Sequence, residues 1–436
     1  MGAMTNRRTP IRFLAAAAGL ALAATVPALA QQPIEPVDLP PSVEQGVDMI
    51  YIDPEIAPRL NDQNVAMHQI SFEEWAGAPL DLFLPVNPIY TDLRRGLVRY
   101  QQRWGGLPQL QIPAAGPAMK VGGSGEKVAM LRERLGLAPG TKFDESLAAA
   151  VKEYQQAHGL KADAVVAGGT ISSLNMGSRH YERLIIVNLE RARRLPLATD
   201  RGRYLLVDVG AARLDMYEGG RVVDNMKVIV GKAETATPMM AALMRYASVN
   251  PYWNVPPELV ISLIAPNVLK QGMTYLKDRR YEVLADWSDE AQAIDPATID
   301  WPAVAAGRKE IRVRQLPGGG NSMGAVKFMM PNDFGIYLHD TPKKDVFAAA
   351  DRWISNGCVR VEDYARLANW LMGGLPQSAD PDRPLKVDMR SPVPVYITYF
   401  TAAATPQGVV FRPDPYRRDP AVIARYFGNE RLVASR

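Results

Sequence analysis

The spacing of hydrophobic residues changes near residue 200 of this chain, and the change constrains the fold more than any other feature of the sequence. Up to about residue 199 the spacing is helical, as Leu93, Leu97 and Tyr100 illustrate. From Tyr204 onward the spacing becomes two, which is typical of half-buried strands. The predicted strands lie at 204–209, 213–217, 222–230, 245–249, 311–316, 324–329, 335–339 and 393–400. The sequence therefore predicts an α+β fold, with helices first and then an antiparallel or mixed sheet.

A compact unit is predicted within the helical half, at 118–176. Val128 and Leu131 lie on the apolar face of its first helix, and Asp144 is placed to cap the second. Thr170 is predicted to cap a short third helix. Three short helices joined by glycine-rich turns make a small bundle, which is either a binding module or a generic spacer.

The first thirty residues have the composition of an export signal. Three arginines up to position 12 precede an apolar run at 13–29, and Ala28-Leu29-Ala30 fits a small-residue cleavage site. We expect cleavage before Gln31 and a periplasmic location. The alternative is an uncleaved anchor, which would be the only membrane contact, since no later segment is long and apolar enough to cross a bilayer.

Composition shifts along the chain predict its domain organisation. In chain order we expect a signal at 1–30, a linker at 31–43, a helical scaffold region at 44–117 and 177–199 around the three-helix domain at 118–176, a β-rich domain at 200–411 and a tail at 412–436. A helical insertion, at about 256–308, interrupts the predicted strands. It lies just upstream of the candidate catalytic residues, so we interpret it as a lid or as a purely structural insertion.

Charge and residue counts exclude several functional classes. The net charge is only +4 and the charges of both signs are mixed, so no basic run indicates nucleic-acid binding. One cysteine and four dispersed histidines do not predict a zinc site. Gly318-Gly319-Gly320 lacks the strand-loop-helix context of a phosphate loop. We therefore expect neither a metal nor a cofactor.

The lone cysteine, Cys358, carries the main functional hypothesis. An unpaired cysteine in an exported protein is buried and inert, forms dimers, or is reactive. His339, at the end of a predicted strand, can take the thiol proton, and Arg360 adds positive charge. A helix predicted at 361–372 would place Cys358 just before a helix N-terminus. The amides of Gly357 and Cys358 are candidate oxyanion donors for acyl transfer.

The segment from His339 to Arg360 resembles the catalytic motif of the L,D-transpeptidases, the YkuD-domain family, in which a His precedes Ser-X-Gly-Cys-hydrophobic-Arg. Gly231-Lys232 with Thr237-Pro238, and the segment from Asn250 to Pro256, resemble two further family segments. The three short helices at 118–176 resemble a peptidoglycan-binding domain, through Leu131-Arg132-Glu133-Arg134-Leu135 and His158-Gly159-Leu160 among others. The larger Gram-negative members of the family, typified by YcbB, share this combination of a binding domain, a catalytic domain and an insertion. In them the insertion forms a substrate-capping subdomain.

The resemblance implies a thioester mechanism. Cys358 would attack the third residue of a peptidoglycan tetrapeptide stem and release D-alanine, and an amine of a second stem would then take the acyl group to form a 3→3 crosslink. The residues that the resemblance and the motif assign to the site are Cys358 and His339 as catalytic, Gly357, Tyr337, Ser355 and Asn356 around the oxyanion loop, and Arg360, Lys327, Arg352 and Trp353 toward substrate. Arg360 either binds a carboxylate or, as we prefer, braces the loop through backbone carbonyls.

Two positions depart from the family pattern. Asn356 stands where many members have His, and Asp340 where many have Gly. We expect a backbone carbonyl near His339, rather than the Asp340 side chain, to orient the imidazole, because adjacent residues on a strand point to opposite faces.

Several alternatives stay open at this point. Water as acceptor would give an L,D-carboxypeptidase, a protein lysine would give wall anchoring, and an inactive site would leave a peptidoglycan-binding protein. A cysteine protease that acts on proteins is a further alternative, but it would give no function to the three-helix unit at 118–176. The expected partners are peptidoglycan stem peptides and other wall-synthesis enzymes, and no nucleic acid.

Overall fold

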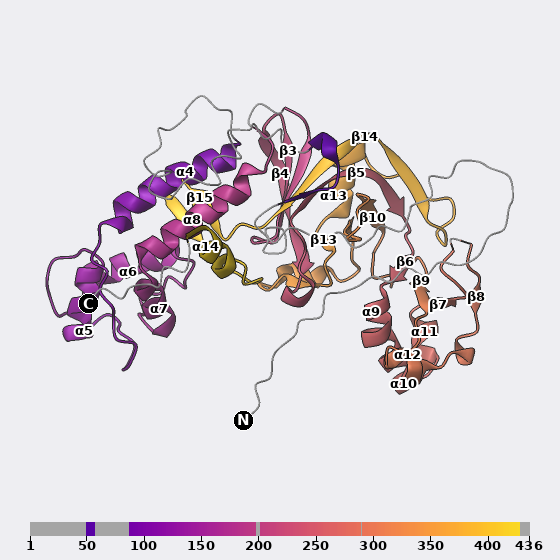
Figure 1. Ribbon diagram of the computed structural model, residues 1–436, viewed down its shortest axis with the longest axis horizontal. Coiled ribbons are helices and arrows are strands. Elements are labelled where there is room, and N and C mark those ends of the chain that lie inside the picture. The colour runs from indigo at the N-terminus through magenta and orange to yellow at the C-terminus, as the bar shows by residue number, and fades with distance from the viewer. Residues whose placement is uncertain (1–48, 57–86, 198–200, 289, 428–436) are drawn as a thin grey trace.

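The computed structural model describes residues 49–56, 87–197, 201–288 and 290–427. Figure 1 shows three bodies along the long axis: a helical lobe at one end, a β-sheet in the middle and a smaller insertion at the other end. The predicted signal and linker lie outside the described residues, as does most of the stretch before residue 87. Within the described part, no helix combines the length and the apolar character needed to cross a bilayer.

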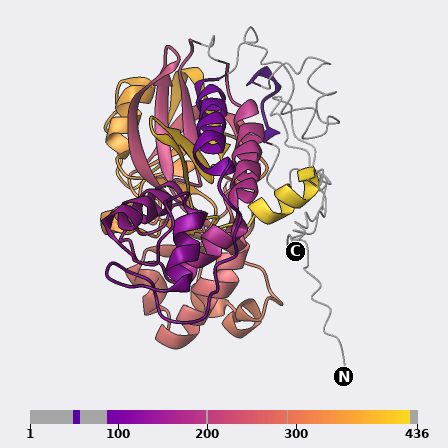
Figure 2. The same ribbon diagram turned by 90° about the vertical axis from the view of Figure 1, so that its left-hand side faces the viewer.

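The helical lobe is built on two long helices that pack against each other, α4 (Pro88–Tyr100) and α8 (Ser178–Arg193). Asn87 caps α4 by accepting a hydrogen bond from the Tyr90 amide at 2.8 Å. Figure 2, which views the molecule from this end, shows the two helices side by side. The helical spacing predicted in both segments is confirmed.

Three short helices lie between α4 and α8 in the chain, as predicted: α5 (Glu126–Arg134), α6 (Glu145–Ala157) and α7 (Gly168–Met176). Asp144 caps α6 through the Leu147 amide at 3.0 Å, which confirms its predicted role. The prediction for Thr170 is wrong. It lies inside α7, is buried, and accepts a hydrogen bond from Gln155 at 3.2 Å.

An aromatic cluster joins the three short helices to the scaffold. The His158 ring stacks on Tyr154 with 3.8 Å between centroids, and its Nε2 lies 3.0 Å from the Tyr100 hydroxyl. Phe411, from the hairpin β15 (Ala402–Thr405) and β16 (Gly408–Phe411), stacks on the other side of the ring at 5.5 Å. The hairpin packs on α4, although the predicted β-rich domain includes it.

The C-terminal segment also folds back onto the scaffold. Helix α14 (Asp419–Phe427) packs on α8, where the fully buried Arg191 forms a 2.8 Å ion pair with Asp419. The described part of the predicted tail is therefore an integral element of the helical lobe.

The central sheet has the strand order β1-β5-β10-β11-β13-β4-β3-β2-β14, and β14 also pairs with β5, so the strands from β5 to β14 form a closed ring of pairings. The bounds are β1 Ile50–Tyr51, β2 Tyr204–Asp208, β3 Arg213–Glu218, β4 Arg221–Gly231, β5 Met240–Val249, β10 Val326–Met329, β11 Leu338–His339, β13 Val359–Val361 and β14 Leu385–Thr398. A further short strand, β12 (Trp353–Ser355), pairs with β4. Parallel pairs (β11–β13, β2–β14) occur beside antiparallel ones, as the mixed prediction allows.

Alternate residues of these strands build one apolar core. Val207, Leu214, Val228 and Val326 are fully buried in it. Helix α13 (Tyr364–Met372) adds Leu367 and other apolar residues to the same core. The predicted α+β class is confirmed.

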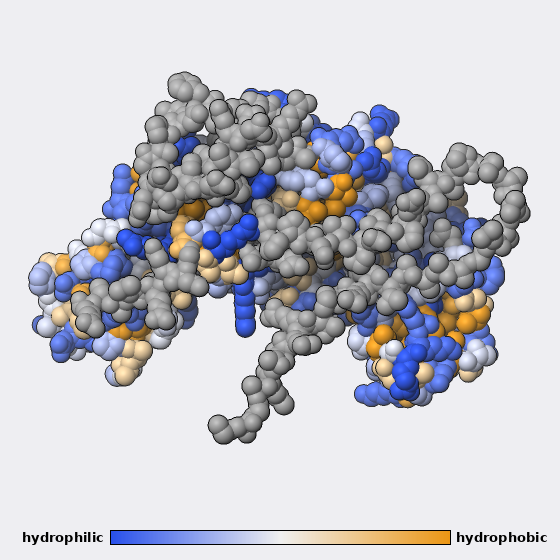
Figure 3. Space-filling model, in the orientation of Figure 1, coloured by the Kyte–Doolittle hydropathy of each residue, from blue (hydrophilic) through white to orange (hydrophobic). Residues whose placement is uncertain are grey.

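The insertion is a mixed subdomain, so the prediction of a helical insertion at about 256–308 is only partly correct. Its helices are α9 (Pro257–Leu259), α10 (Ala265–Gln271), α11 (Thr274–Asp278) and α12 (Trp301–Ala305). A four-stranded sheet accompanies them, formed by β6 (Trp253–Val255), β9 (Arg312–Gln315), β7 (Tyr281–Leu284) and β8 (Ala293–Ile294). The strand predicted at 311–316 thus belongs to the insertion. Figure 3 shows hydrophobic residues among hydrophilic ones on the visible face of this subdomain, and its large exposed apolar side chains include Leu269 and Trp287.

Candidate active site

Strand β11 places His339, the predicted base, beside β13, the strand that begins directly after Cys358. β11 and β13 are parallel, and His339 pairs with Arg360 in their register. On its other edge β11 is antiparallel to β10, where His339 pairs with Lys327. Residues paired across neighbouring strands project from the same face of a sheet. Lys327, His339 and Arg360 therefore form one row across three strands, which we call the cationic row.

The adjacent row contains the thiol. Alternation along each strand places Tyr337 on the face of His339, and Cys358 on the face of Arg360. The Val359 amide donates to the Tyr337 carbonyl at 3.1 Å, which holds the two chains in this register up to Cys358. Val359 itself points to the opposite face and is fully buried in the core. The sheet thus assembles five predicted site residues on one face.

The thiol is partly buried and protonated in the resting arrangement. Its Sγ lies 3.5 Å from the Gly335 carbonyl oxygen, to which it donates. Burial raises the pKa of the Cys358 thiol, whereas hydrogen bonding from Tyr337 and the charges of Lys327 and Arg360 lower it. Because the net shift is upward, the nucleophile needs a base to remove its proton during the reaction.

His339 is neutral and lies on the same face as the thiol, so it can serve as that base, although the burial that keeps the ring neutral also weakens its basicity. It is 2% exposed, and burial, followed by the charge of Arg360, lowers its pKa to about 3, against the opposing effect of hydrogen bonds to the Asp340 and Met323 backbone. Its Nδ1 lies 2.6 Å from the Asp340 carbonyl oxygen. A carbonyl only accepts, so the 2.6 Å contact with Asp340 favours the tautomer in which Nδ1 carries the proton, and in that tautomer Nε2 can accept one. Among the hydrogen bonds of the described residues, none joins His339 to Cys358, and such catalytic contacts commonly tighten with substrate.

The loop before the thiol is held by side chains, and this narrows the choice of oxyanion donor. The Gly357 amide donates to Ser355 Oγ at 3.2 Å, and Thr237 Oγ1 donates to the Gly357 carbonyl at 2.7 Å. Ser355 Oγ in turn donates to the Cys358 carbonyl at 2.7 Å. Gly357 has a φ of +116°, which a residue with a side chain rarely adopts. In the described structure the Cys358 amide has no acceptor, so of the two predicted donors only it is free.

The helix-terminus argument for activating the thiol is wrong. The predicted helix at 361–372 begins instead at Tyr364, with Asp363 as N-cap, and β13 separates it from Cys358. The positive surroundings of Cys358 therefore come from side chains and not from a helix dipole.

Arg360 does not brace the loop, which corrects the preference stated above. Its Nε is buried without an acceptor, and within the described part of the chain its guanidinium makes no hydrogen bond or ion pair. Lys327 has its Nζ 5.0 Å from the Tyr337 ring centroid and likewise has no anionic partner among the described residues. Burial lowers the pKa of both side chains, and Cys358 opposes this effect when it is a thiolate.

Two other predicted residues, Arg352 and Trp353, are engaged away from the cationic row. Arg352 donates to the Ala211 carbonyl at 3.1 Å, and Trp353 Nε1 donates to the Val209 carbonyl at 2.8 Å. Both therefore fix the turn between β2 and β3 rather than project into the cationic row. Asn356 is exposed beside the loop.

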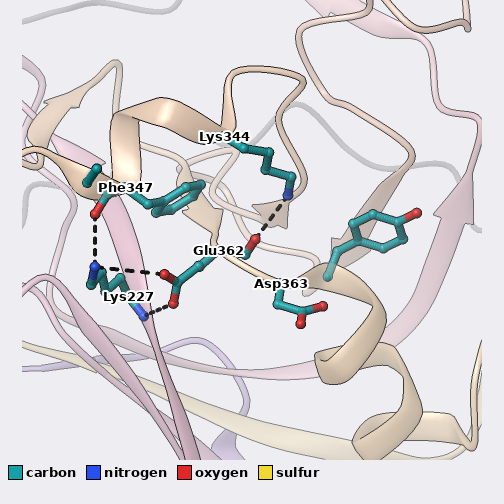
Figure 4. Close-up of a pocket in the computed structure, with 7 residues that line it drawn as sticks. Lys227, Lys344, Phe347, Glu362 and Asp363 are labelled. Carbon is teal, nitrogen blue, oxygen red and sulfur yellow. Dashed lines mark hydrogen bonds and ion pairs between the residues drawn. The ribbon is translucent and has the colours of Figure 1, made fainter.

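A pocket of about 520 Å³ opens beyond the end of β13, beside Asp340. Figure 4 shows Lys344 reaching the Glu362 backbone and Lys227 reaching the Phe347 carbonyl. Lys344 Nζ donates to the Glu362 carbonyl at 3.0 Å and to Asp340 Oδ1 at 2.6 Å. Lys344 thus ties the pocket wall to the residue that orients the base.

Sequence reasoning missed several residues of this site. Lys344 supports Asp340, while Met323 lies 3.3 Å from the Tyr337 hydroxyl as a sulfur acceptor. The only sequence signal for Lys344 was its positive charge four residues after the negatively charged Asp340. No sequence signal pointed to Met323. In the described part of the chain no group of three or more His, Cys, Asp or Glu side chains is placed to hold a metal.

Comparison with known families agrees with the geometry. Residues 202–397 match the family described as "L,D-transpeptidase catalytic domain", YkuD, and residues 125–174 match the "Putative peptidoglycan binding domain" family. A Haemophilus influenzae protein named "Putative L,D-transpeptidase" is 32% identical over 235 residues, which are 52% of this chain and 47% of that protein. This chain thus spans about half the length of the curated relative that it matches.

Solved structures of similar proteins include an L,D-transpeptidase from Xylanimonas cellulosilytica and one from Mycobacterium smegmatis. The first is 16% identical, with 65% of this chain and 99% of that chain covered and a TM-score of 0.21. The second is 12% identical, with 45% and 59% covered and a TM-score of 0.23. At such TM-scores these likenesses carry no argument.

Proposed function

We propose that this chain, which carries a YkuD-type L,D-transpeptidase catalytic domain and a peptidoglycan-binding-type domain, is a peptidoglycan L,D-transpeptidase that makes 3→3 crosslinks. The observation that carries the proposal is the shared face of Cys358 and His339, with a protonated thiol, a neutral buried imidazole and a free Cys358 amide. These are the nucleophile, the base and the oxyanion donor that acyl transfer requires.

In the first half-reaction Cys358 Sγ attacks the carbonyl of the third stem residue, and His339 Nε2 takes the thiol proton. The carbonyl oxygen becomes an oxyanion, which the Cys358 amide stabilises. Collapse breaks the peptide bond, His339 returns the proton to the departing amine, and D-alanine leaves. A thioester on Cys358 remains. The neutral state of His339 favours the first transfer because an imidazolium could not accept the proton.

In the second half-reaction the side-chain amine of a diamino acid on another stem attacks the thioester. His339 takes a proton from this amine and passes it to the departing Cys358 thiolate as the C–S bond breaks, so the thiol is regenerated and an amide bond forms. Water in place of the amine gives the carboxypeptidase outcome, and a protein lysine gives anchoring of a protein to the wall.

The insertion is proposed to cap the bound stem, as in the larger subgroup typified by YcbB. Its apolar core, which contains Trp253 and Met323, packs against Tyr337 in the thiol's row. We further propose that the chain acts in the periplasm after export through its first thirty residues, alongside other wall-synthesis enzymes.

The test is incubation of the purified protein with tetrapeptide-stem muropeptides, followed by mass analysis of protein and products. The proposal expects a transient acyl adduct and a dimer lacking one D-alanine, both absent with Cys358→Ala. Tripeptide alone would assign the carboxypeptidase activity. Retained binding to sacculi with no adduct would instead support a non-catalytic peptidoglycan-binding protein.

A further inference from the structure

We infer that Lys327 and Arg360 form a subsite for the free C-terminal carboxylate of the donor's leaving residue, and that this subsite restricts the enzyme to donors that end one residue beyond the bond it breaks. The inference rests on the proposed function, since it assigns a role within the same site.

The first argument is that two cations face the thiol without a counter-charge. Arg360 Nε is buried with no acceptor, and neither Arg360 nor Lys327 pairs with an acid among the described residues. Asp340, which follows His339 in the chain, is committed to Lys344 at 2.6 Å and to the Ala325 amide at 2.8 Å. Glu362, two residues after Arg360, accepts from the Lys227 amide at 3.1 Å. Both side chains are partly buried, and a buried guanidinium nitrogen with no acceptor is costly, so its retention beside a nucleophile indicates an anionic ligand.

The second argument comes from the position of the base. His339 must hand its proton to the leaving amine, so that nitrogen lies next to the imidazole when the peptide bond breaks. In an amino acid the carboxylate carbon is only about 2.5 Å from the amine nitrogen. The cationic row places Lys327 and Arg360 on the strands either side of His339, one strand spacing of about 4.8 Å away. A carboxylate on the leaving residue therefore falls between the two cations.

The third argument concerns what the site would reject. A donor with one more residue presents a neutral amide at this point and leaves both cations unpaired. Charge-assisted hydrogen bonds are about twice as strong as neutral ones. The site therefore discriminates by the charge of the leaving residue and not by its side chain.

A competing account gives both cations only a general electrostatic role, in which they stabilise the thiolate and the oxyanion. That role would assist every donor equally. The two accounts separate when donors differ only in the charge of the terminal group.

The experiment uses two synthetic tetrapeptide donors that differ only in ending as a carboxylate or a carboxamide. Acyl-enzyme formation on the full chain is followed by intact mass, for the wild type, Lys327→Met, Arg360→Met and Arg360→Lys. Lys343→Met is the matched control, because Lys343 is exposed and its side chain makes no contact given for the described residues. Alkylation of Cys358 by iodoacetamide reports the integrity of the thiol in each variant.

The wild type is expected to acylate from the carboxylate donor about 10- to 100-fold faster, the range of one or two charge-assisted hydrogen bonds. In Arg360→Met and Lys327→Met, acylation from the carboxylate donor should slow while acylation from the carboxamide donor stays the same, so most of the preference is lost. Arg360→Lys should keep a preference between those of Arg360→Met and the wild type. Equal losses for both donors, or no wild-type preference, would overturn the subsite. No acylation of the wild type by either donor would instead overturn the proposed function, and the subsite with it.

Discussion

His339 Nδ1 lies 2.6 Å from the backbone carbonyl oxygen of Asp340, while the carboxylate of the same aspartate is engaged elsewhere. Asp340 Oδ2 accepts from the Ala325 amide at 2.8 Å, and Oδ1 accepts from Lys344 at 2.6 Å. The main chain of Asp340 therefore sets the tautomer of the base, and its side chain fixes the position of that main chain. This agrees with the expectation that a backbone carbonyl, rather than a side-chain acid, orients the imidazole.

Replacing Asp340 with alanine should destabilise the protein by about 1 to 2 kcal/mol, because the partly buried Ala325 amide loses its acceptor. Lys344→Met should cost less, about 1 kcal/mol or below, since the Lys344 side chain is 47% exposed. Denaturant unfolding measures both, with Lys343→Met as the control. Equal stability of Asp340→Ala and the wild type would show that the anchor has no effect on the fold.

Gly324 gives a second way to disturb the same anchor. Its φ is +63°, and a methyl group added there would collide with the Asp340 carboxylate. Gly324→Ala should therefore lower the acylation rate at least several-fold by displacing the carbonyl that holds His339. Acylation kinetics check this, with Gly319→Ala as the control because a methyl group there would meet open space. Identical rates in the two variants would contradict the linkage.

The pH dependence of Cys358 alkylation should report the raised pKa of the thiol. Only the thiolate reacts, and burial raises the pKa, so the iodoacetamide rate should still be rising above the ordinary thiol pKa of about 8.5. Tyr337→Phe removes a hydroxyl that lowers this pKa and should move the profile to higher pH. A midpoint below pH 8 would mean that a thiolate is present before substrate arrives.

Two buried histidines should make the fold sensitive to acid. Burial lowers the pKa of both His158 and His339 to about 3. Between that value and 6.5 the unfolded chain binds more protons than the folded one, so the free energy of unfolding rises with pH and is lost as pH falls through this window. At pH 5 the loss is about 2 kcal/mol for each histidine.

Urea unfolding at pH 7 and pH 5 tests this linkage. His339→Asn should reduce the difference between the two pH values by about 2 kcal/mol, the contribution of one histidine. His158 and His180, whose pKa values are also lowered by burial, still titrate in this variant. A variant whose pH dependence equals that of the wild type would contradict the assignment to His339.

Local features of the fold could be predicted from the sequence because they depend on periodicity and caps. The helices, the change of period at Tyr204 and the Asp144 cap all rest on neighbouring residues. The pairing of strands and helices that lie far apart in the chain could not be predicted in this way. The insertion's own sheet, and the C-terminal helix that pairs Asp419 with Arg191, join segments far apart in the chain and have no periodic signal.

The candidate site divides in the same way. A lone cysteine in a glycine-flanked turn and a histidine at a strand end were sufficient to identify Cys358 and His339 as the candidates. Their placement on one face follows from the register of β11 and β13, which the sequence does not encode locally. The occupied Gly357 amide and the unpaired Arg360 could be found only from side-chain contacts.

The central claim is that Cys358 and His339 act as nucleophile and base in one acyl-transfer site. Intact-protein mass during incubation with a tetrapeptide-stem donor tests it most directly. The account predicts an adduct with the mass of the stem minus D-alanine on the wild type, none on Cys358→Ala, and formation slowed at least 100-fold in His339→Asn, in line with the contribution of a general base. Equal adduct on Cys358→Ala and the wild type would contradict it.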